Sequence, residues 1–311
     1  MQEAGAPLRW RELRKVLHSN TESITQFNQH RLGGGAFCRG VYHAVHKKRD
    51  IAVKIANIKH TGTLQHEADI LAKLSHDNVI RCLSNAIDKP KYAYLKFEYV
   101  NGCDLFTFFS ERTPTLPRQR VLTRTMSDLA LTGRRHIARS LLSALEYLHS
   151  VNIVHNDVKL ENIMVGAALL SRITEETPVK LLDFGLAYEM GTKAQTSFNR
   201  GGSVQWIAPE KVAEKDFDIG CAGDIFSFGL IIYAMMDGHM PYQIPDNLNG
   251  PEIYIFFEKT LPLVQRRIVD TEGGLLARRE VKEVLLSTLK QQPKARKTAT
   301  ALLKLDLFKD S

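Results

Sequence analysis

The chain has little cysteine and no long apolar run. Its cysteines, Cys38, Cys82, Cys103 and Cys221, are scattered without a Cys-x-x-Cys or Cys/His spacing, so neither a zinc site nor a disulfide framework is indicated. Reduced thiols of this kind fit a cytosolic or nuclear setting. Residues 1–10 lack the apolar core of a signal peptide, and the longest apolar run, residues 230–236, is too short to cross a bilayer. We therefore expect an intracellular protein without a membrane span.

The composition also lacks the biases that indicate disordered or fibrous chains. Hydrophobic residues make up 44% and charged residues 24% of the sequence, as in ordinary globular proteins. A chain of 311 residues can bury a substantial core, and two lobes or domains are expected at this length. The net charge of +8 favours an acidic partner only where basic residues cluster.

Basic residues cluster in two places. In a basic N-terminal extension, residues 1–26, Trp10, Leu13 and Leu17 have the spacing of a short amphipathic helix, which either packs on the first lobe or contacts a partner or membrane. Segment 112–135 contains six arginines, at positions 112, 118, 120, 124, 134 and 135, and one acid, Asp128, giving 6 − 1 = +5. We interpret it as a solvated insertion or a docking site for an acidic partner. It lacks the interleaved aromatics that stack on bases, so nucleic acid is not expected.

Several side chains with catalytic functional groups occur together at residues 155–162, His-Asn-Asp-Val-Lys-Leu-Glu-Asn. A carboxylate (Asp157), an amine (Lys159) and a carboxamide (Asn162) occur within these eight positions. The run resembles the catalytic loop of protein kinases, H-R-D-x-x-x-x-N, with Asn156 in place of the arginine. Surface turns have a similar composition, so the rest of the chain must decide between the two interpretations.

Upstream landmarks match the same family. The glycines at 33–35 precede a β-branched strand that carries Lys54, a combination that resembles the kinase loop over the nucleotide and its lysine. Cys38 stands at the place of the third glycine, and Val41 comes one residue late. A helix expected over residues 64–74 places Glu67 on its inward face, where a carboxylate needs a partner such as Lys54. Residues 92–100 alternate like a strand.

Downstream landmarks follow in the family's order. The tripeptide Asp183-Phe184-Gly185 ends a predicted strand, after an insertion at 166–178. A helix is expected over 137–149. Residues 202–210, Gly-Ser-Val-Gln-Trp-Ile-Ala-Pro-Glu, resemble the end of an activation segment, and Arg296 resembles the arginine that pairs with its glutamate, here Glu210.

The resemblance covers residues 27–308 and implies a eukaryotic-type serine/threonine protein kinase. The implied fold is α+β with two lobes. Residues 27–100 would form a small antiparallel sheet with one helix, and residues 101–308 a larger, mainly helical lobe. The implied activity is ATP- and magnesium-dependent transfer of the γ-phosphate to serine or threonine hydroxyls of a protein. A nucleotide-binding pseudokinase or scaffold is the alternative, because the glycine loop is irregular.

The family also implies a role for each matching residue. Asp157 would be the base, Lys159 would meet the γ-phosphate, Lys54 held by Glu67 would bind the α- and β-phosphates, and Ser203 would contact Asp157 and Lys159. Magnesium would be held by Asn162 and Asp183. The remaining nucleotide contacts would be Leu32, Gly33, Gly34, Gly35, Val41, Ala52, Glu98, Val100, Asp104 and Met164. Asp104 could also be a helix N-cap.

Asn156 is the informative departure from the family pattern. Where an arginine stands at this place, it pairs with a phosphate on the activation segment and orders the loop. An asparagine has no charge for that purpose. We therefore predict activity that does not depend on phosphorylation of Thr192, Thr196 or Ser197.

Overall fold

The computed structural model describes residues 24–33, 38, 40–84, 87–88, 92–109, 129–166, 173–192, 202–213 and 220–309. The chain divides into two compact units, Met1–Ser75 with Val79–Val100, and His76–Asn78 with Asn101–Ser311. The helix expected at 9–17, the glycines at 34 and 35 and most of segment 112–135 lie outside the described residues.

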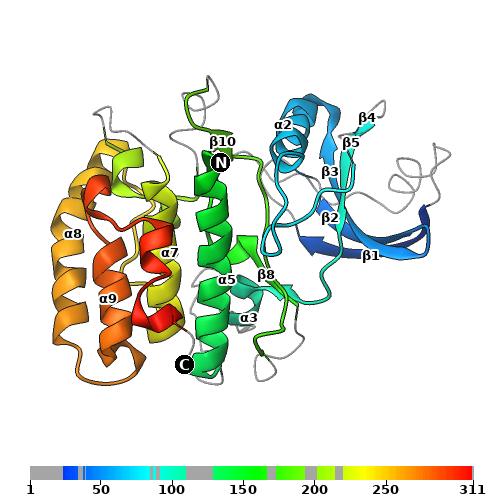
Figure 1. Cartoon of the computed structure of the whole chain (residues 1–311). Helices are drawn as coiled ribbons and strands as arrows, with labels where there is room; N and C mark the ends of the chain where they lie inside the picture. The colour runs from blue at the N-terminus through cyan, green and yellow to red at the C-terminus, as the bar shows by residue number, and fades with distance from the viewer. Residues whose placement is uncertain are drawn as a thin grey trace, which may run out of the picture. The chain divides into compact units, whose positions relative to one another are not determined.

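The first unit is built on an antiparallel sheet with strand order β1-β2-β3-β5-β4 (Figure 1). Its strands are β1 (Ile24–Gly33), β2 (Gly40–His46), β3 (Arg49–Asn57), β4 (Ile87–Asp88) and β5 (Tyr92–Glu98). In the central strand β3, Ile51, Val53 and Ile55 are buried, because alternate side chains of a strand share a face. Lys54 therefore lies on the opposite face, which is less covered.

Helix α2 (Thr61–Leu71) follows the short 3-10 turn η1 (Ile58–His60) and contacts β3 and β5. Its buried face consists of Leu64, Glu67, Ala68, Ile70 and Leu71. It begins and ends three residues before the helix expected over 64–74. Two strand boundaries also differ from expectation. β5 ends at Glu98 and not at 100, and β1 begins at Ile24, inside the segment assigned to the N-terminal extension.

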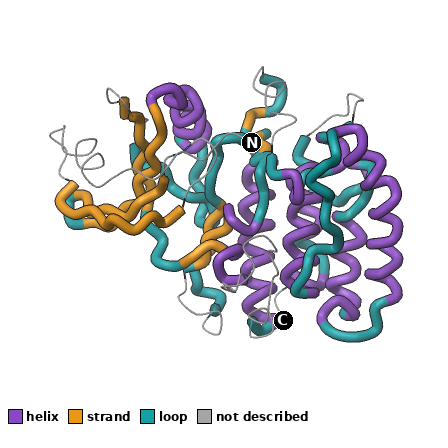
Figure 2. The backbone as a smooth tube through the Cα atoms, turned by 180° about the vertical axis from the view of Figure 1, so that it is seen from behind, coloured by secondary structure: helices purple, strands orange, loops and turns teal. Residues whose placement is uncertain are grey.

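The second unit is mainly helical, as Figure 2 shows from behind. Its helices are α3 (Leu105–Phe109), α5 (Leu131–Ser150), α7 (Ala222–Asp237), α8 (Gly250–Asp270), α9 (Arg279–Thr288) and α10 (Ala299–Leu302). Helix α7 is the core element, because every residue from Gly223 to Met236 is buried. Helices α5 and α9 pack against it. No helix in the described part of the chain has both the length and the apolar character needed to span a membrane.

Short strands and 3-10 turns frame the loops of this unit. A three-stranded sheet has the order β6-β8-β9, with β6 (Cys103–Asp104), β8 (Ile163–Val165) and β9 (Val179–Leu181), and β7 (Ile153–Val154) pairs with β10 (Tyr188–Glu189). The turns are η2 (Leu160–Asn162), η4 (Val204–Trp206), η5 (Pro209–Lys211), η6 (Leu275–Ala277), η7 (Pro293–Ala295) and η8 (Asp306–Phe308). The predicted α+β fold, a small sheet unit with one α-helix among its described residues and a larger helical unit, is confirmed.

Helix α5 corrects one prediction about charge. It begins at Leu131, six residues before the expected start at 137, and so includes Arg134 and Arg135, which had been assigned to the insertion. Arg134 is buried; its Nε donates to the carbonyl of Leu129 at 2.8 Å, and its guanidinium also bonds the carbonyl of Met235 on α7. The remaining arginines of the segment, at 112, 118, 120 and 124, give with Asp128 a charge of 4 − 1 = +3.

Candidate active site

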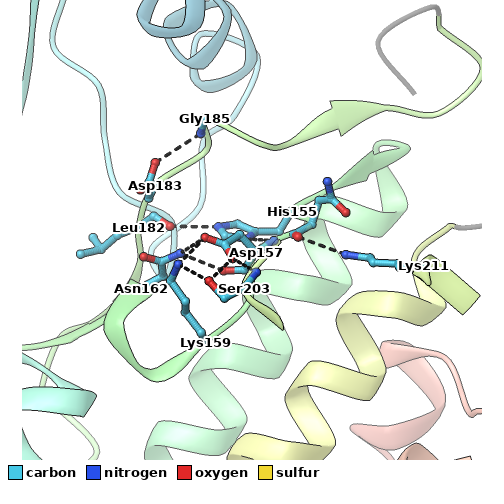
Figure 3. Close-up of polar contacts among 10 residues, drawn as sticks. His155, Asp157, Lys159, Asn162, Leu182, Asp183, Gly185, Ser203 and Lys211 are labelled. Carbon is cyan, nitrogen blue, oxygen red and sulfur yellow. Dashed lines mark hydrogen bonds and ion pairs between the residues drawn. The ribbon is translucent and has the colours of Figure 1, made fainter. Parts of the chain in front are cut away.

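The catalytic-loop residues lie between strands β7 and β8, and the β8–β9 pairing brings the Asp-Phe-Gly tripeptide beside them. The N–H of Leu182 donates to the carbonyl of Asn162 at 2.8 Å. Asp183, the next residue after Leu182, therefore lies close to Asn162. Figure 3 shows Asn162 and Asp183 on these neighbouring segments. Two residues predicted to hold magnesium therefore come from adjacent strand ends.

The carboxylate of Asp157 is fixed by four hydrogen bonds (Figure 3). The backbone N–H and the hydroxyl of Ser203 each donate to Oδ1 at 3.0 Å. Oδ2 accepts from Lys159 Nζ at 2.6 Å and from Asn162 Nδ2 at 3.2 Å. The predicted contact of Ser203 with Asp157 is thus present, and Lys159 and Asn162 also donate to the carboxylate, which has one defined orientation.

Lys159 connects the two sides of this cluster. Its Nζ lies 2.7 Å from Ser203 Oγ as well as 2.6 Å from Asp157 Oδ2. Ser203 belongs to the segment that leads into the turns η4 and η5, 44 residues beyond Lys159. The end of the activation segment is therefore tied directly to the catalytic loop.

The backbone of the catalytic loop is held by Asp224 at the start of α7. Asp224 accepts from the N–H groups of His155 at 2.9 Å and Asn156 at 2.8 Å, and His149 Nε2 lies 3.1 Å away. Burial raises the pKa of this carboxyl, but the hydrogen bond and charge of His149 and the positive charges nearby outweigh burial, and the pKa lies below its ordinary value. No role for Asp224 was predicted from the sequence. The signal that could have indicated one is an acidic residue in the first turn of a highly apolar helix, because such a residue needs hydrogen-bond or charged partners.

His155 joins the loop to the Asp-Phe-Gly tripeptide. Its ring is buried, lies 4.8 Å from the ring of Phe184 and places Nε2 2.9 Å from the carbonyl of Leu182. Burial lowers the pKa of the imidazole. Because Nδ1 accepts from the N–H of Asp157 at 3.3 Å, the neutral ring with its proton on Nε2 satisfies both contacts.

Asn156 has the left-handed backbone conformation, with φ of +69°. Asparagine tolerates this conformation better than most residues, because its short polar side chain can bond locally. Its Nδ2 donates to the carbonyl of Leu186 at 3.1 Å, just beyond the Asp-Phe-Gly tripeptide. The residue that replaces the family's arginine therefore makes a neutral contact with the start of the activation segment.

In the first unit, Lys54 and Glu67 form the ion pair that the sequence predicts. Lys54 Nζ lies 2.7 Å from Glu67 Oε2, and the side chain of Glu67 is 2% exposed. Removing a carboxylate from water is costly unless it is paired. The pair therefore holds the lysine amine at a defined place on the sheet.

The other predicted nucleotide contacts lie in both units. Val41, Ala52 and Lys54 share one face of the first unit's sheet, since Val41 pairs with Lys54 and Ala52 lies two residues along the same strand. Glu98 N–H donates to the carbonyl of Arg81 at 3.0 Å and is thus committed to the protein. Leu32 is exposed and Val100 is half-buried, and among the described residues other than its chain neighbours no atom lies within 4 Å of a Cβ built on Gly33.

In the second unit, Asp104 and Met164 are direct neighbours across β6 and β8. The carboxylate of Asp104 accepts from the N–H of Thr107 at 2.8 Å and from its hydroxyl at 2.7 Å. The N-cap interpretation of Asp104 is therefore correct.

A buried ion pair anchors the segment that ends in Ala-Pro-Glu. Arg296 donates to both carboxylate oxygens of Glu210, at 2.6 and 2.7 Å, and both side chains are at most 1% exposed. The guanidinium also lies 4.8 Å from the ring centre of Phe226 on α7. This predicted contact is present, and its paired geometry satisfies both charges in the interior.

The comparisons with known proteins agree with this geometry. The protein kinase domain family matches residues 27–308. Serine/threonine-protein kinase 33 of Bos taurus is 29% identical over 283 residues, which cover 88% of this chain and 52% of that protein. RAC-beta serine/threonine-protein kinase B of Xenopus laevis is 30% identical over 258 residues, 83% of this chain and 45% of that protein.

CBL-interacting serine/threonine-protein kinase 16 of Arabidopsis thaliana is 28% identical over 246 residues, 72% of this chain and 47% of that protein. The chain thus spans about half the length of the curated relatives it matches. The family match extends from β1 to η8 and includes the Asp157 cluster, the Lys54–Glu67 pair and the Glu210–Arg296 anchor. The chain belongs to the eukaryotic-type serine/threonine protein kinase family.

Proposed function

We propose that the chain is an active, ATP- and magnesium-dependent protein kinase that transfers the γ-phosphate to serine or threonine hydroxyls of a protein. The observation that carries the proposal is the orientation of Asp157 by Ser203, Lys159 and Asn162. Phosphoryl transfer needs positioned groups and electrostatic stabilisation more than covalent chemistry. A cluster of this kind is what such a reaction requires.

The residues proposed to hold magnesium fit that ion. Asn162 uses its amide nitrogen to donate to Asp157, to the carbonyl at 2.8 Å and the carboxylate at 3.2 Å, which leaves the amide oxygen as the atom for a cation. Asp183 supplies carboxylate oxygens from the left-handed conformation, with φ of +60°. Magnesium prefers a few protein oxygens, with water and phosphate oxygens completing its shell. When bound, the ion would neutralise charge on the phosphates.

The remaining roles follow from the charges in place. Lys54, fixed by Glu67, would bind the α- and β-phosphates. Lys159 now bridges Asp157 and Ser203, and it is the cation nearest to the base, so it would turn to the γ-phosphate as charge develops there. That movement would free Asp157 Oδ2 to accept the proton of a substrate hydroxyl. The lysine two positions after the aspartate favours serine and threonine as acceptors.

Two further parts of the proposal concern partners and place. All four cysteines are thiols and not disulfides in the described part of the chain, which supports a reducing, intracellular setting, cytoplasmic or nuclear. The arginines at 112, 118, 120 and 124 are proposed to bind an acidic protein. The electrostatic attraction would be weaker than predicted from the sequence, because the charge of the insertion falls from +5 to +3 once Arg134 and Arg135 belong to α5.

The test is transfer of labelled γ-phosphate from Mg·ATP to a generic basic protein, comparing wild type with Asp157→Ala and Asp183→Asn. Loss of a positioned base should lower the rate roughly 10²–10⁴-fold. Asp270→Ala is the matched control, because Asp270 is 63% exposed and, among the described residues, makes only a surface ion pair with Arg266. A wild type that binds ATP but transfers nothing would leave the pseudokinase alternative in place of the proposal.

A further inference from the structure

Lys211 is a buried lysine whose amine reaches the catalytic loop. It is the last residue of η5, directly after Glu210, and is only 4% exposed. Its Nζ donates to the carbonyl of Asn156 at 3.1 Å, and Figure 3 shows the side chain extended toward the loop. Burying an ammonium group is costly unless the interior compensates it, so this placement requires an explanation.

The surroundings of Lys211 supply the compensation. Burial lowers the pKa of its amine most strongly, and Arg296 lowers it further, while the carboxylates of Asp224, Glu210 and Asp157 act in the opposite direction. The negative charges of three acids, which come from three separate segments, therefore act on this one amine. Their negative charge favours the ammonium form, although the pKa remains below its ordinary value.

The hydrogen bond of Lys211 acts on the peptide unit that leads into Asp157. The carbonyl of Asn156 and the N–H of Asp157 belong to the same planar peptide. The carbonyl accepts from Lys211 at 3.1 Å, and the N–H donates to His155 Nδ1 at 3.3 Å. With both edges held, the plane of this peptide is fixed, and with it the direction in which the Asp157 side chain leaves the backbone.

The neighbouring glycines leave room for this lysine. A Cβ added at Gly223 would lie 3.1 Å from Lys211 Cε, and one added at Gly202 would lie 3.0 Å from the Asn156 carbonyl oxygen. Gly202 also has φ of +119°, a conformation that side chains rarely adopt. The start of α7 and the segment before Ser203 are therefore both shaped around the contact between Lys211 and Asn156.

We propose that Lys211 is a positioning residue for the phosphoryl transfer, which fixes the Asn156–Asp157 peptide and so aims the base. The proposal rests on the proposed kinase activity. Lys211 also supplies a cation to the catalytic loop. Its amine bonds the backbone of Asn156, which directly precedes Asp157 and whose own side chain carries no charge. The loop is then ordered from the Ala-Pro-Glu side by a lysine, without a phosphate on the activation segment.

The test compares Lys211→Met, which keeps the side-chain length but removes the charge and donor, with Lys211→Arg, which keeps both. Lys282→Met is the matched control, because Lys282 Nζ also donates to backbone carbonyls, those of Val269 at 2.7 Å and Thr271 at 2.9 Å, away from Asp157. We expect Lys211→Met to lower kcat roughly tenfold to a hundredfold, with the KM for ATP within about twofold, partial recovery in Lys211→Arg, and unchanged kcat in Lys282→Met.

Hydrogen exchange of the backbone amides separates this proposal from the proposed function. Lys211→Met should speed exchange in residues 155–162, whereas Lys282→Met should affect only the end of α8. A wild type without transferase activity would overturn the kinase proposal. The hydrogen exchange of residues 155–162 in Lys211→Met would still show whether Lys211 holds the catalytic loop. If Lys211→Met unfolds, Gly223→Ala, whose Cβ would press on Lys211 Cε, takes its place. Wild-type kcat together with wild-type exchange in either variant would overturn the positioning role.

Discussion

At the scale of single residues, the proposed role of Asp157 as the base requires one of its hydrogen bonds to be replaced during the reaction. Four donors occupy its carboxylate, so a substrate hydroxyl must replace one of them. The two donors from Ser203 act on Oδ1, and those from Lys159 and Asn162 act on Oδ2. In the proposed reaction Lys159 would be the donor that is replaced, because it would gain a new partner as charge develops on the γ-phosphate.

This arrangement makes Ser203 the group that keeps Asp157 oriented while Lys159 moves. Ser203→Ala removes a donor to Asp157 and an acceptor for Lys159, and we expect kcat to fall about tenfold, the size of one hydrogen bond to a charged group. Ser203→Thr keeps the hydroxyl and should retain most of the activity. Steady-state kinetics with Mg·ATP measure the effect.

Ser150→Ala is the control for this series. At the exposed end of α5, the Ser150 hydroxyl donates to the carbonyl of Tyr147 and to no other group in the described part of the chain. Equal kcat for Ser203→Ala and Ser203→Thr would mean that the hydroxyl does not orient the base.

Individual residues also show how far the sequence alone could go. The resemblance to protein kinases predicted both the Lys54–Glu67 and the Glu210–Arg296 pair, and Glu67 also falls on the inward face of a predicted helix, where an acid needs a cation. The roles of Asp224 and Lys211 were not predictable in the same way. Each bonds the backbone of the catalytic loop. Every residue has a backbone, so the sequence does not indicate which residue is the partner in such a contact.

At the scale of secondary-structure elements, α5 shows why boundaries are harder to predict than landmarks. Its first turns contain Thr132, Gly133, Arg134 and Arg135, which break the apolar periodicity that marks the rest of the helix. Arg134 is nevertheless buried, because carbonyls of Leu129 and Met235 accept its hydrogen bonds. Tertiary contacts extend this helix where local propensity alone would not.

The contact between α7 and α9 gives a prediction for packing. A Cβ on Gly229 of α7 would lie 2.3 Å from Thr288 Oγ1 and 2.8 Å from Thr288 Cβ. Gly229→Ala should therefore lower the free energy of unfolding by about 1–3 kcal/mol, since the two helices must separate to admit a methyl group.

Gly62→Ala in α2 is the matched comparison, because no described atom outside its own helix backbone and chain neighbours lies within 4 Å of its added Cβ, and alanine in a helix is expected to stabilise by about 0.5–1 kcal/mol. Urea unfolding of both variants measures the difference. An unfolding free energy equal to that of wild type in Gly229→Ala would show that α7 and α9 can move apart without cost.

At the scale of the whole molecule, two histidines with lowered pKa values predict a loss of stability in mild acid. Burial lowers the pKa of the buried His155 and of the half-buried His76, which favours the neutral ring in the fold. Their Nδ1 atoms accept N–H groups, from Asp157 and Asn78 respectively. Unfolding then takes up protons between the lowered folded pKa and about 6.5, which makes stability fall as pH decreases through that window.

The slope should reach at most about 1.4 kcal/mol per pH unit for each histidine. Asp224 acts in a different window. Its lowered pKa contributes stability that is lost only when pH falls below about 4. Urea unfolding between pH 7.5 and 5.5 measures the histidine part, and His76→Gln should reduce the slope. A stability independent of pH over this range would contradict the assignment of neutral rings.

The whole molecule is also the scale for regulation. We expect the variant with alanine at Thr192, Thr196 and Ser197 to retain wild-type kcat within about twofold, because the catalytic loop is held by Asp224 and Lys211 and not through a charged residue at 156. Phosphatase treatment of wild type should leave kcat equally unchanged. Abolished turnover with intact ATP binding in the alanine variant would show that phosphorylation is required.

The ion pair between Glu210 and Arg296 has a consequence for how the chain is made. Its partners are 86 residues apart in sequence, and both are buried. During synthesis, Glu210 leaves the ribosome long before Arg296 is added, and until then a buried carboxylate would lack its cation. The second unit therefore completes its fold only after Arg296 has been translated, and a chain arrested before residue 296 should be a target for chaperones and proteases.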